Sequence, residues 1–370
     1  MNLKINHRIG QGIVDVQYFN EFKVNLKFDS VASTFSFDFY FDPRNKQHAE
    51  LACVSHFHEA IVEHNGETLI TGFILSQNFI HAPEKKMVSI GGYSKPGVIL
   101  DCDIPTNQYP LQSDGLTLRQ IANKLISPFR LGLQVADVAK KDAAMGAKTI
   151  SQKSDRAITK STASESKNIN SYLTDLCSQR NIVLSHTPKG ELLLTEANTE
   201  QEPILHFDGE LIGTEMEMMF NGQGIHSHIT VIKQASMDGG NAGEYTVRNP
   251  YCPVAYVYRP KVVVADSADD ITIEEAAMNE LGAELKNITL IIKTDRWEVD
   301  GKVIRPNNLI TVKDPELFLY NKSTWFIEEV ELHGNQSKTT ATLKCVPPEV
   351  YNGKMPKNIF VDPHENLPRF

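Results

Sequence analysis

The chain has 370 residues, of which 41% are hydrophobic and 22% charged, an ordinary composition for a globular protein large enough for two or three domains. Its formal net charge of −9 argues against specific binding to nucleic acid, because phosphate contacts need a basic surface. The five scattered cysteines offer no disulfide framework or zinc knuckle, and the absence of a long apolar run argues against direct membrane insertion.

The first part of the chain, residues 1–113, is predicted to be a β-barrel-like domain. Apolar side chains alternate with polar ones, which is typical of strands with one buried face. Asn65-Gly66 predicts a tight hairpin between two of these strands. This number of short strands favours a small barrel or sandwich. The expected strands are residues 22–28, 35–41, 60–62, 69–75 and 87–90.

The middle part, residues 114–202, contains a near-repeat of a helix–strand unit with an offset of 51 residues. Each copy has apolar side chains at helical spacing, followed by a short alternating strand. Asp114 and Ser166 are the expected N-caps, and Pro128 is expected to end the first helix. The two stripes are Leu118, Ile121, Ala122, Leu125 and Ile126, and Ile169, Tyr172, Leu173, Leu176 and Cys177, with strands at Leu131 and Leu133 and at Ile182 and Leu184.

Between the two copies, residues 138–167 change in character. They hold seven basic and three acidic residues, many Ser, Thr and Ala, and few large apolar side chains. This composition predicts a solvated, flexible loop, and a basic arm that orders against an acidic partner is the alternative. After the second copy, Pro188 and Gly190 predict a hairpin turn.

Residues 203–351 are predicted to form a second β-barrel-like domain that contains one helix. Thr272 and Glu275 form a capping box at the start of that helix, which extends to about residue 285. The tail, residues 352–370, is polar and punctuated by proline, and we expect it to be loosely held. The expected strands are residues 215–220, 225–233, 254–258, 261–264, 289–293 and 309–312, followed by a hairpin of 325–332 with 339–346.

Two His-x-His pairs, His56 with His58 and His226 with His228, are the candidates for metal chemistry. Neither pair has a carboxylate at a characteristic spacing, so histidines on the surface or at strand edges are the simpler interpretation. The acidic pair Glu328-Glu329 is interpreted as a solvated strand face. We therefore predict no catalytic, cofactor-binding or metal-binding residue, and a metal-dependent hydrolase on a β-scaffold remains the alternative from another class.

Five segments, in order along nearly the whole chain, resemble a known family. The chain is similar to the baseplate hub proteins of contractile-tailed phages, namely the Mu-type tail protein related to the late control protein of other myophages. Tyr93 stands where that family usually has Arg, Ile304 stands where Trp is usual, and 138–167 has no evident counterpart. The segments are residues 24–38, GETLITGFI at 66–74, GYSKPGVILDC at 92–102, RPNNL at 305–309 with Val312, and WFIEEVELHGNQSKTTATLKCVPPEVY at 325–351.

The resemblance implies an α+β, mostly β fold in which two barrel-like domains flank the duplicated unit. It also implies a ring-shaped homotrimer without catalytic residues or cofactors. Such a hub adapts a six-fold tail tube to a three-fold spike, with spike, tube and baseplate wedge proteins as partners. Its location would be the baseplate of a virion tail, after assembly in the host cytoplasm. The hub of a secretion-system or tailocin spike is the alternative within the same architecture.

Overall fold

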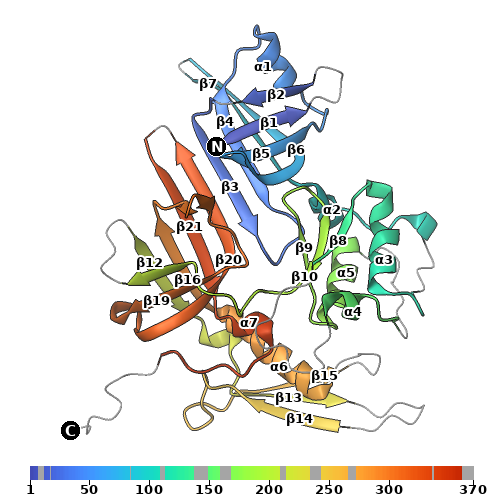
Figure 1. Ribbon diagram of the computed structural model, residues 1–370, viewed down its shortest axis with the longest axis vertical. Coiled ribbons are helices and arrows are strands. Elements are labelled where there is room, and N and C mark those ends of the chain that lie inside the picture. The colour runs from blue at the N-terminus through green and yellow to red at the C-terminus, as the bar shows by residue number, and fades with distance from the viewer. Residues whose placement is uncertain are drawn as a thin grey trace.

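A large β-sheet organises the molecule (Figure 1). The computed structural model of the protein describes residues 1–6, 12–16, 18–83, 85–108, 113–136, 149–158, 168–208, 214–233, 243–265, 272–335 and 337–360. Within these residues the sheet has 13 strands. They are β1 (Asn2–Asn6), β2 (Ile13–Val16), β3 (Glu21–Lys27), β4 (Thr34–Tyr40), β5 (Glu59–His64), β6 (Glu67–Ala82), β7 (Lys85–Ser94), β11 (Leu205–Asp208), β12 (Glu215–Phe220), β16 (Ile288–Thr294), β19 (Leu309–Asp314), β20 (Leu319–Asn335) and β21 (Thr339–Val346).

The strands follow the order β12-β16-β21-β20-β3-β4-β7-β6-β5-β1-β2. Beside this path, β19 pairs with the first part of β20, and β11 pairs with β19. The N-terminal and C-terminal parts of the chain therefore meet where β20 pairs with β3. This pairing is antiparallel and extends from Glu329 opposite Lys27 to Asn335 opposite Glu21. We call it the seam.

The two faces of the seam have different chemistry. One face is apolar, with Val24, Leu26, Val330 and Leu332 all buried. The other face carries complementary polar pairs across the two strands: Lys23 Nζ lies 3.2 Å from Glu331 Oε1, Lys27 Nζ lies 3.8 Å from Glu329 Oε2, and Asn25 Nδ2 donates to Glu329 Oε1 at 2.6 Å. Cross-strand pairs of this kind stabilise a sheet and fix its register.

The predicted fold class is confirmed at the level of an α+β, mostly β protein. The predicted hairpins at residues 21–41, 59–75 and 325–346 are also present. The two β-rich parts are not separate bodies, however. They share one sheet and one apolar core, to which Phe37 and Trp325 both belong, and the described residues contain no closed barrel. No helix among them is long and apolar enough to cross a membrane.

The middle module is inserted between β7 and β11 and has its own core. Both predicted helical stripes are confirmed, since every residue in them is buried. The caps differ from expectation: Thr117, not Asp114, caps the first helix, and Asn168 caps the second, while Ser166 lies outside the described residues. The elements are α3 (Leu118–Ile126), α5 (Ile169–Ser178) and a sheet of β8 (Leu133–Val135), β10 (Leu192–Thr195) and β9 (Val183–His186).

Part of the expected loop at 138–167 is ordered by specific contacts. Residues 149–158 include a short helix, α4 (Ile150–Ser154), which begins with a capping box of Thr149 and Gln152. Ile150 is buried. The Arg180 guanidinium donates to the Lys153 carbonyl at 2.8 Å and to the Arg156 carbonyl at 2.7 Å. The loop expectation is therefore wrong for residues 149–158, and the rest of that segment lies outside the described residues.

The lower module is inserted between β12 and β16. Its strands are β13 (His228–Lys233), β14 (Gly243–Arg248) and β15 (Pro260–Ala265), and α6 (Ile273–Glu284) covers one of their faces. The predicted capping box of α6 is confirmed. The strand expected at residues 254–258 is wrong: this stretch is a turn, in which the Pro253 carbonyl accepts from the Tyr256 amide at 2.9 Å. The proline and this local hydrogen bond favour a turn, so the stretch does not pair with another strand.

The chain then forms a short helix, α7 (Glu349–Asn352), and part of the tail packs against the body. Pro356 is buried, and the Tyr251 hydroxyl donates to the Lys357 carbonyl at 2.9 Å. The expectation of a loose tail is therefore wrong for residues 352–360, and residues 361–370 lie outside the described part. Other elements that we did not predict include α1 (Lys46–Leu51), α2 (Val98–Asp101), the strands β1, β2, β11 and β14, and the short pair β17 (Glu298–Val299) and β18 (Lys302–Val303).

The packing of the seam gives a prediction for Gly334, which lies opposite Phe22. A Cβ atom at Gly334 would lie 2.6 Å from Phe22 Cε1. The Phe22 ring has little room to move, because Phe19, Phe37 and Trp297 contact it at centroid distances of 5.5, 5.9 and 5.4 Å. We expect Gly334→Ala to lower the free energy of unfolding by about 1–3 kcal/mol, measured by chemical denaturation.

The matched control is Gly222→Ala, where the nearest atom would be Phe220 Cε1 at 3.4 Å. Its effect should stay below about 1 kcal/mol. Since alanine ordinarily stabilises a strand position relative to glycine, an unchanged or higher stability of Gly334→Ala would show that the seam is loosely packed at this point.

Candidate functional site

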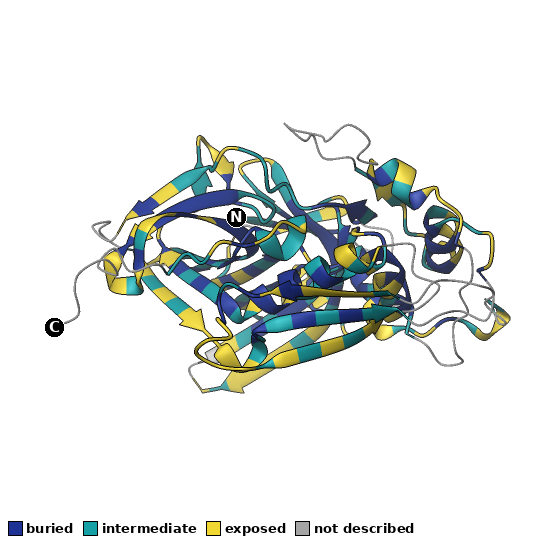
Figure 2. Cartoon of the chain, turned by 90° about the horizontal axis from the view of Figure 1, so that it is seen from below, coloured by how far each residue is buried: buried dark blue, intermediate teal, exposed yellow. Residues whose placement is uncertain are grey.

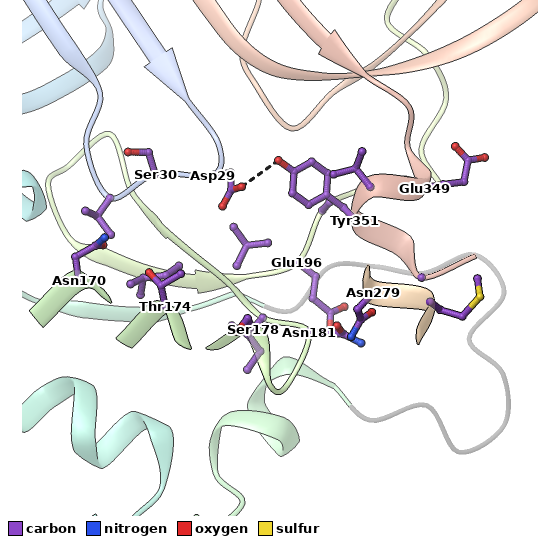
Figure 3. Close-up of a pocket in the computed structure, with 18 of the residues that line it drawn as sticks. Asp29, Ser30, Asn170, Thr174, Ser178, Asn181, Glu196, Asn279, Glu349 and Tyr351 are labelled. Carbon is purple, nitrogen blue, oxygen red and sulfur yellow. Dashed lines mark hydrogen bonds between the residues drawn. The ribbon is translucent and has the colours of Figure 1, made fainter. Parts of the chain in front are cut away.

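The turn after β3, the middle module, α6 and α7 meet around a cavity of about 490 Å³ (Figure 3). The turn after β3 contributes Asp29 and Ser30 to its wall, and α7 contributes Tyr351. The exposed side of α5 adds a polar row, and Asn279 of α6 lies in the facing wall. The polar row on α5 is Asn170, Thr174 and Ser178, and Asn181 follows in the turn after the helix. The cavity therefore lies between modules, and its lining is partly polar and partly apolar.

A charged network beside this cavity ties the joint together. The Tyr351 hydroxyl donates toward two carboxylates, at 2.7 Å from Glu328 Oε1 and 3.3 Å from Asp29 Oδ2. Lys344 Nζ lies 2.9 Å from Glu328 Oε2, and Lys286 forms an ion pair with Asp29 and lies 5.2 Å from the centre of the Tyr351 ring. The network thus connects β20, β21, α7, the turn after β3 and the chain that follows α6.

Glu328 is the centre of this network and is only 8% exposed. We interpreted it as part of a solvated strand face, and this is wrong because the register of β20 with β21 shifts between Ile327 and Glu329. The bulge turns Glu328 inward. Burial acts to raise the pKa of its carboxyl, but the hydrogen bond from Tyr351 and the charges of Lys344 and Lys286 together lower that pKa below 4.5.

A second contact joins the middle module to the seam. His186 at the end of β9 reaches the turn between β3 and β4, where Nδ1 lies 2.8 Å from the Ser30 carbonyl oxygen and Nε2 lies 2.8 Å from Ser33 Oγ. Nδ1–H donates to the carbonyl, so a neutral imidazole accepts the Ser33 hydroxyl at Nε2. The neighbouring Ser185 hydroxyl donates to the Phe28 carbonyl at 2.6 Å. Burial lowers the pKa of His186 from 6.5 to about 4.

This histidine clamp predicts a dependence of stability on pH. The unfolded chain binds a proton at His186 near pH 6.5, whereas the folded chain binds it only near pH 4, so the clamp contributes fully above pH 6.5 and less as the pH falls toward 4. We expect the free energy of unfolding to fall by about 1–3 kcal/mol over this range. Chemical denaturation at a series of pH values measures it.

In His186→Gln this component should be absent, while His81→Gln, at an exposed position, should keep the wild-type slope. If His186→Gln and the wild-type protein lose stability in parallel between pH 6.5 and 4, the clamp does not titrate as described.

The Glu328 network generates a separate prediction. Glu328→Gln removes a buried carboxylate that binds Tyr351 and the half-exposed Lys344, and we expect a loss of about 1–3 kcal/mol in the free energy of unfolding. Since the folded pKa lies below 4.5, the difference from wild type should be complete above that pH and should shrink below it. Glu331→Gln, which breaks the more exposed pair with Lys23, should cost less than about 1 kcal/mol. Equal effects of the two substitutions would rule out a special role for Glu328.

The two histidine pairs are engaged in separate local contacts. His56 Nε2 lies 3.5 Å from Cys53 Sγ, and the rings of His56 and His58 meet edge to face at 5.3 Å. In the other pair, His226 Nδ1 lies 2.6 Å from Glu284 Oε1, while His228 packs its ring against Tyr258. Among the described residues, no group of three or more His, Cys, Asp or Glu side chains is arranged to hold a metal ion.

Exposed apolar side chains gather at the two ends of the large sheet and on the lower module. At one end, Ile13 on β2 is 61% exposed; at the other, Met219 and Phe220 on β12 are 49% and 43% exposed. Beside β12, an open groove of about 490 Å³ is lined by Met218, Phe220, Tyr251, Leu317, Phe318 and Phe360. Sheet ends and apolar grooves are surfaces for association with other chains.

The comparisons with known proteins agree with a role in assembly. No protein-family model matches the chain. The chain is 22% identical over 301 residues to the baseplate hub protein gp44 of Escherichia phage Mu, a match that covers 78% of this chain and 74% of that protein. This relative is a structural phage tail protein, which argues for a non-enzymatic role.

Solved structures of tail proteins share the fold. The 43 kDa tail protein of prophage MuSo2 from Shewanella oneidensis superposes with a TM-score of 0.73 at 16% identity, over 96% of this chain and 100% of that one. The tail protein from Neisseria meningitidis MC58 gives a TM-score of 0.73 at 17% identity, over 96% and 99%. A component of the Escherichia coli type VI secretion system gives a TM-score of 0.53 at 10% identity, over 97% and 80%.

The order of motifs, the mixed sheet fold and the match to the Mu protein point the same way. The resemblance predicted from the sequence is confirmed: the chain is similar to the Mu baseplate hub protein over most of its length and shares its fold with prophage tail proteins.

Proposed function

We propose that the chain works as a homotrimeric ring that adapts a six-fold tail tube to a three-fold spike in the baseplate of a contractile phage tail. The observation that carries this proposal is the seam. It holds two β-rich parts side by side in one protomer, so that three protomers supply six comparable positions around an axis.

The ends of the sheet support a closed ring. Within the described residues, β12 and β2 are the last strands of the sheet order, and each presents an open edge together with exposed apolar side chains. The two ends differ in sequence, IVDV in β2 and EMEMMF in β12, so contact between unlike ends of neighbouring copies is heterologous. A heterologous contact closes into a ring when its rotation fits, and closure covers the edges.

We further propose that one side of this ring contacts the spike and the other the tail tube, with baseplate wedge proteins outside. The inserted modules are suited to such contacts because each has its own core and projects from the large sheet (Figure 1). The location follows from these partners: the virion tail, reached after assembly in the host cytoplasm. The barrel-like character of each half would be completed only in the assembled ring.

The hub of a secretion-system or tailocin spike is the second candidate, and the fold shared with the type VI component favours it over any enzyme. A metal-dependent hydrolase is the third. Metal analysis of protein purified without chelators separates it from the others, because stoichiometric zinc that is lost in His56→Ala or His226→Ala would contradict a purely structural hub.

The trimer is tested by light scattering at tens of micromolar protein. We expect a mass of three 41.4 kDa chains, retained at high salt because apolar contacts dominate. Met219→Glu places a charge at the exposed apolar end of the sheet and should weaken the trimer at least about tenfold in dissociation constant. Tyr256→Glu, which lies on the lower module, is the control and should leave the mass unchanged. A stable wild-type monomer at these concentrations would contradict the ring.

A further inference from the structure

The turn of the β5–β6 hairpin makes a second contact between the N-terminal and C-terminal parts of the chain, apart from the seam. His64 Nε2 lies 2.5 Å from Glu298 Oε1 of β17, and the Asn65 side-chain amide donates to the same oxygen at 2.9 Å. Beside them, the Arg305 guanidinium donates to Glu67 Oε1 at 2.9 and 2.6 Å. We call these five residues the turn bridge.

Asn65 and Gly66 form the tip of this hairpin. Both have a positive φ, 48° and 81°, which suits a two-residue turn of type I′. The centre of the molecule is mostly buried, while exposed residues lie toward turns and outer strands (Figure 2), and Asn65 and Gly66 are both exposed. A Cβ atom at Gly66 would have nothing within 4 Å. The Asn65–Gly66 peptide is therefore open to water, with free space on its glycine side.

An asparagine followed by glycine carries a reactive pair of groups. The Gly66 nitrogen can lose its proton and bond to Cγ of Asn65, while the Cγ–Nδ2 bond breaks and ammonia leaves with that proton. Glycine permits this ring closure because it has no side chain to obstruct it. Water then opens the succinimide ring at one of its two carbonyls, which gives aspartate or isoaspartate. Water is the only co-reactant.

The chain has three Asn-Gly steps, and they differ in what the asparagine side chain does. Asn221 and Asn352 each use Oδ1 to accept from the backbone amide two residues on, at 3.2 and 2.9 Å. A carboxylate oxygen accepts the same bond. Asn65 instead uses Nδ2 to donate to the Glu298 carboxylate, a role that a second carboxylate cannot take.

Deamidation of Asn65 would bring two carboxylates together in the turn bridge. Like charges at this distance repel each other. The side chains of His64 and Glu298 are only 13% and 32% exposed, so solvent screens the repulsion in part. Isoaspartate would also add one methylene to the backbone at the tightest point of the hairpin and disturb its register. Each product therefore weakens the bridge.

We propose that Asn65 is a site of spontaneous deamidation, and that its product loosens the turn bridge, so that this contact between the two parts of the chain weakens as the protein ages. The Arg305–Glu67 pair and the seam do not involve the asparagine amide, and the effect is local to the hairpin turn and β17. The inference is independent of the proposed ring, because every group in it belongs to one protomer.

The first test follows the chemistry in the full chain. The protein is incubated at mildly alkaline pH, and mass spectrometry of tryptic peptides reports the replacement of an amide by a carboxyl group at each Asn-Gly step. We expect conversion at Asn65. Asn65→Gly, which tolerates the positive φ and has no side-chain amide, should show none at this step. A wild-type chain that stays unchanged at Asn65, while a synthetic peptide of residues 59–70 converts, would overturn the proposal.

The second test measures the consequence without waiting for the reaction. Hydrogen exchange follows residues 64–68 and 298–303 in Asn65→Asp, and we expect exchange there to be about tenfold faster than in wild type. Asp-Gly suits the same turn type, so the backbone preference is kept. Exchange in β3 at the seam should not change. Asn221→Asp and Asn352→Asp are the matched controls and should behave as wild type in all these segments.

A third comparison isolates the charge. Asn65→Gly removes the hydrogen bond without adding a carboxylate and should speed exchange by only about threefold. In a Glu298→Gln background, Asn65→Asp should no longer speed exchange beyond Glu298→Gln alone, because the new carboxylate can accept from the glutamine amide. If Asn65→Asp acts no more strongly than Asn65→Gly, or acts equally in both backgrounds, repulsion from Glu298 is not the cause and the proposal fails.

Discussion

The pairing of β3 with β20 is the contact on which the rest of the molecule depends. It joins strands about 300 residues apart along the chain, so the entropy of closing the loop between them must be offset by the contacts that the closure creates. The apolar face supplies buried area, and the ion pairs on the other face fix the register. A slip of β20 by one residue against β3 would move Leu332 to the polar face and Glu331 into the core.

Everything between the two partners is arranged around that closure. The middle and lower modules enter between strands of the large sheet and return to it, and each has a local apolar core of its own. Their positions relative to the sheet are set by fewer groups: the His186 clamp for the middle module and the Asp29–Lys286–Glu328–Tyr351 network for the region of α6 and α7. Because these contacts are polar and directional, they fix an orientation that apolar packing alone would leave less defined.

The sequence predicts what is local and misses what is not. The stripes of α3 and α5 and the hairpin at Asn65-Gly66 were predictable, because periodicity and turn chemistry act over a few residues. The seam was not predictable, because β3 and β20 each have a hairpin partner nearby in the sequence, and nothing in either strand indicates which distant strand pairs with its other edge. Glu328 was misassigned for a related reason, because alternation places it outside until a bulge reverses the pattern.

The open edges follow from the same architecture. A sheet held together at its centre by the seam leaves its free strands at the far ends, and modules inserted within it add edges of their own. The proposed ring would cover the ends of the large sheet, because the unlike ends of neighbouring copies can pair there and close the row of free backbone groups.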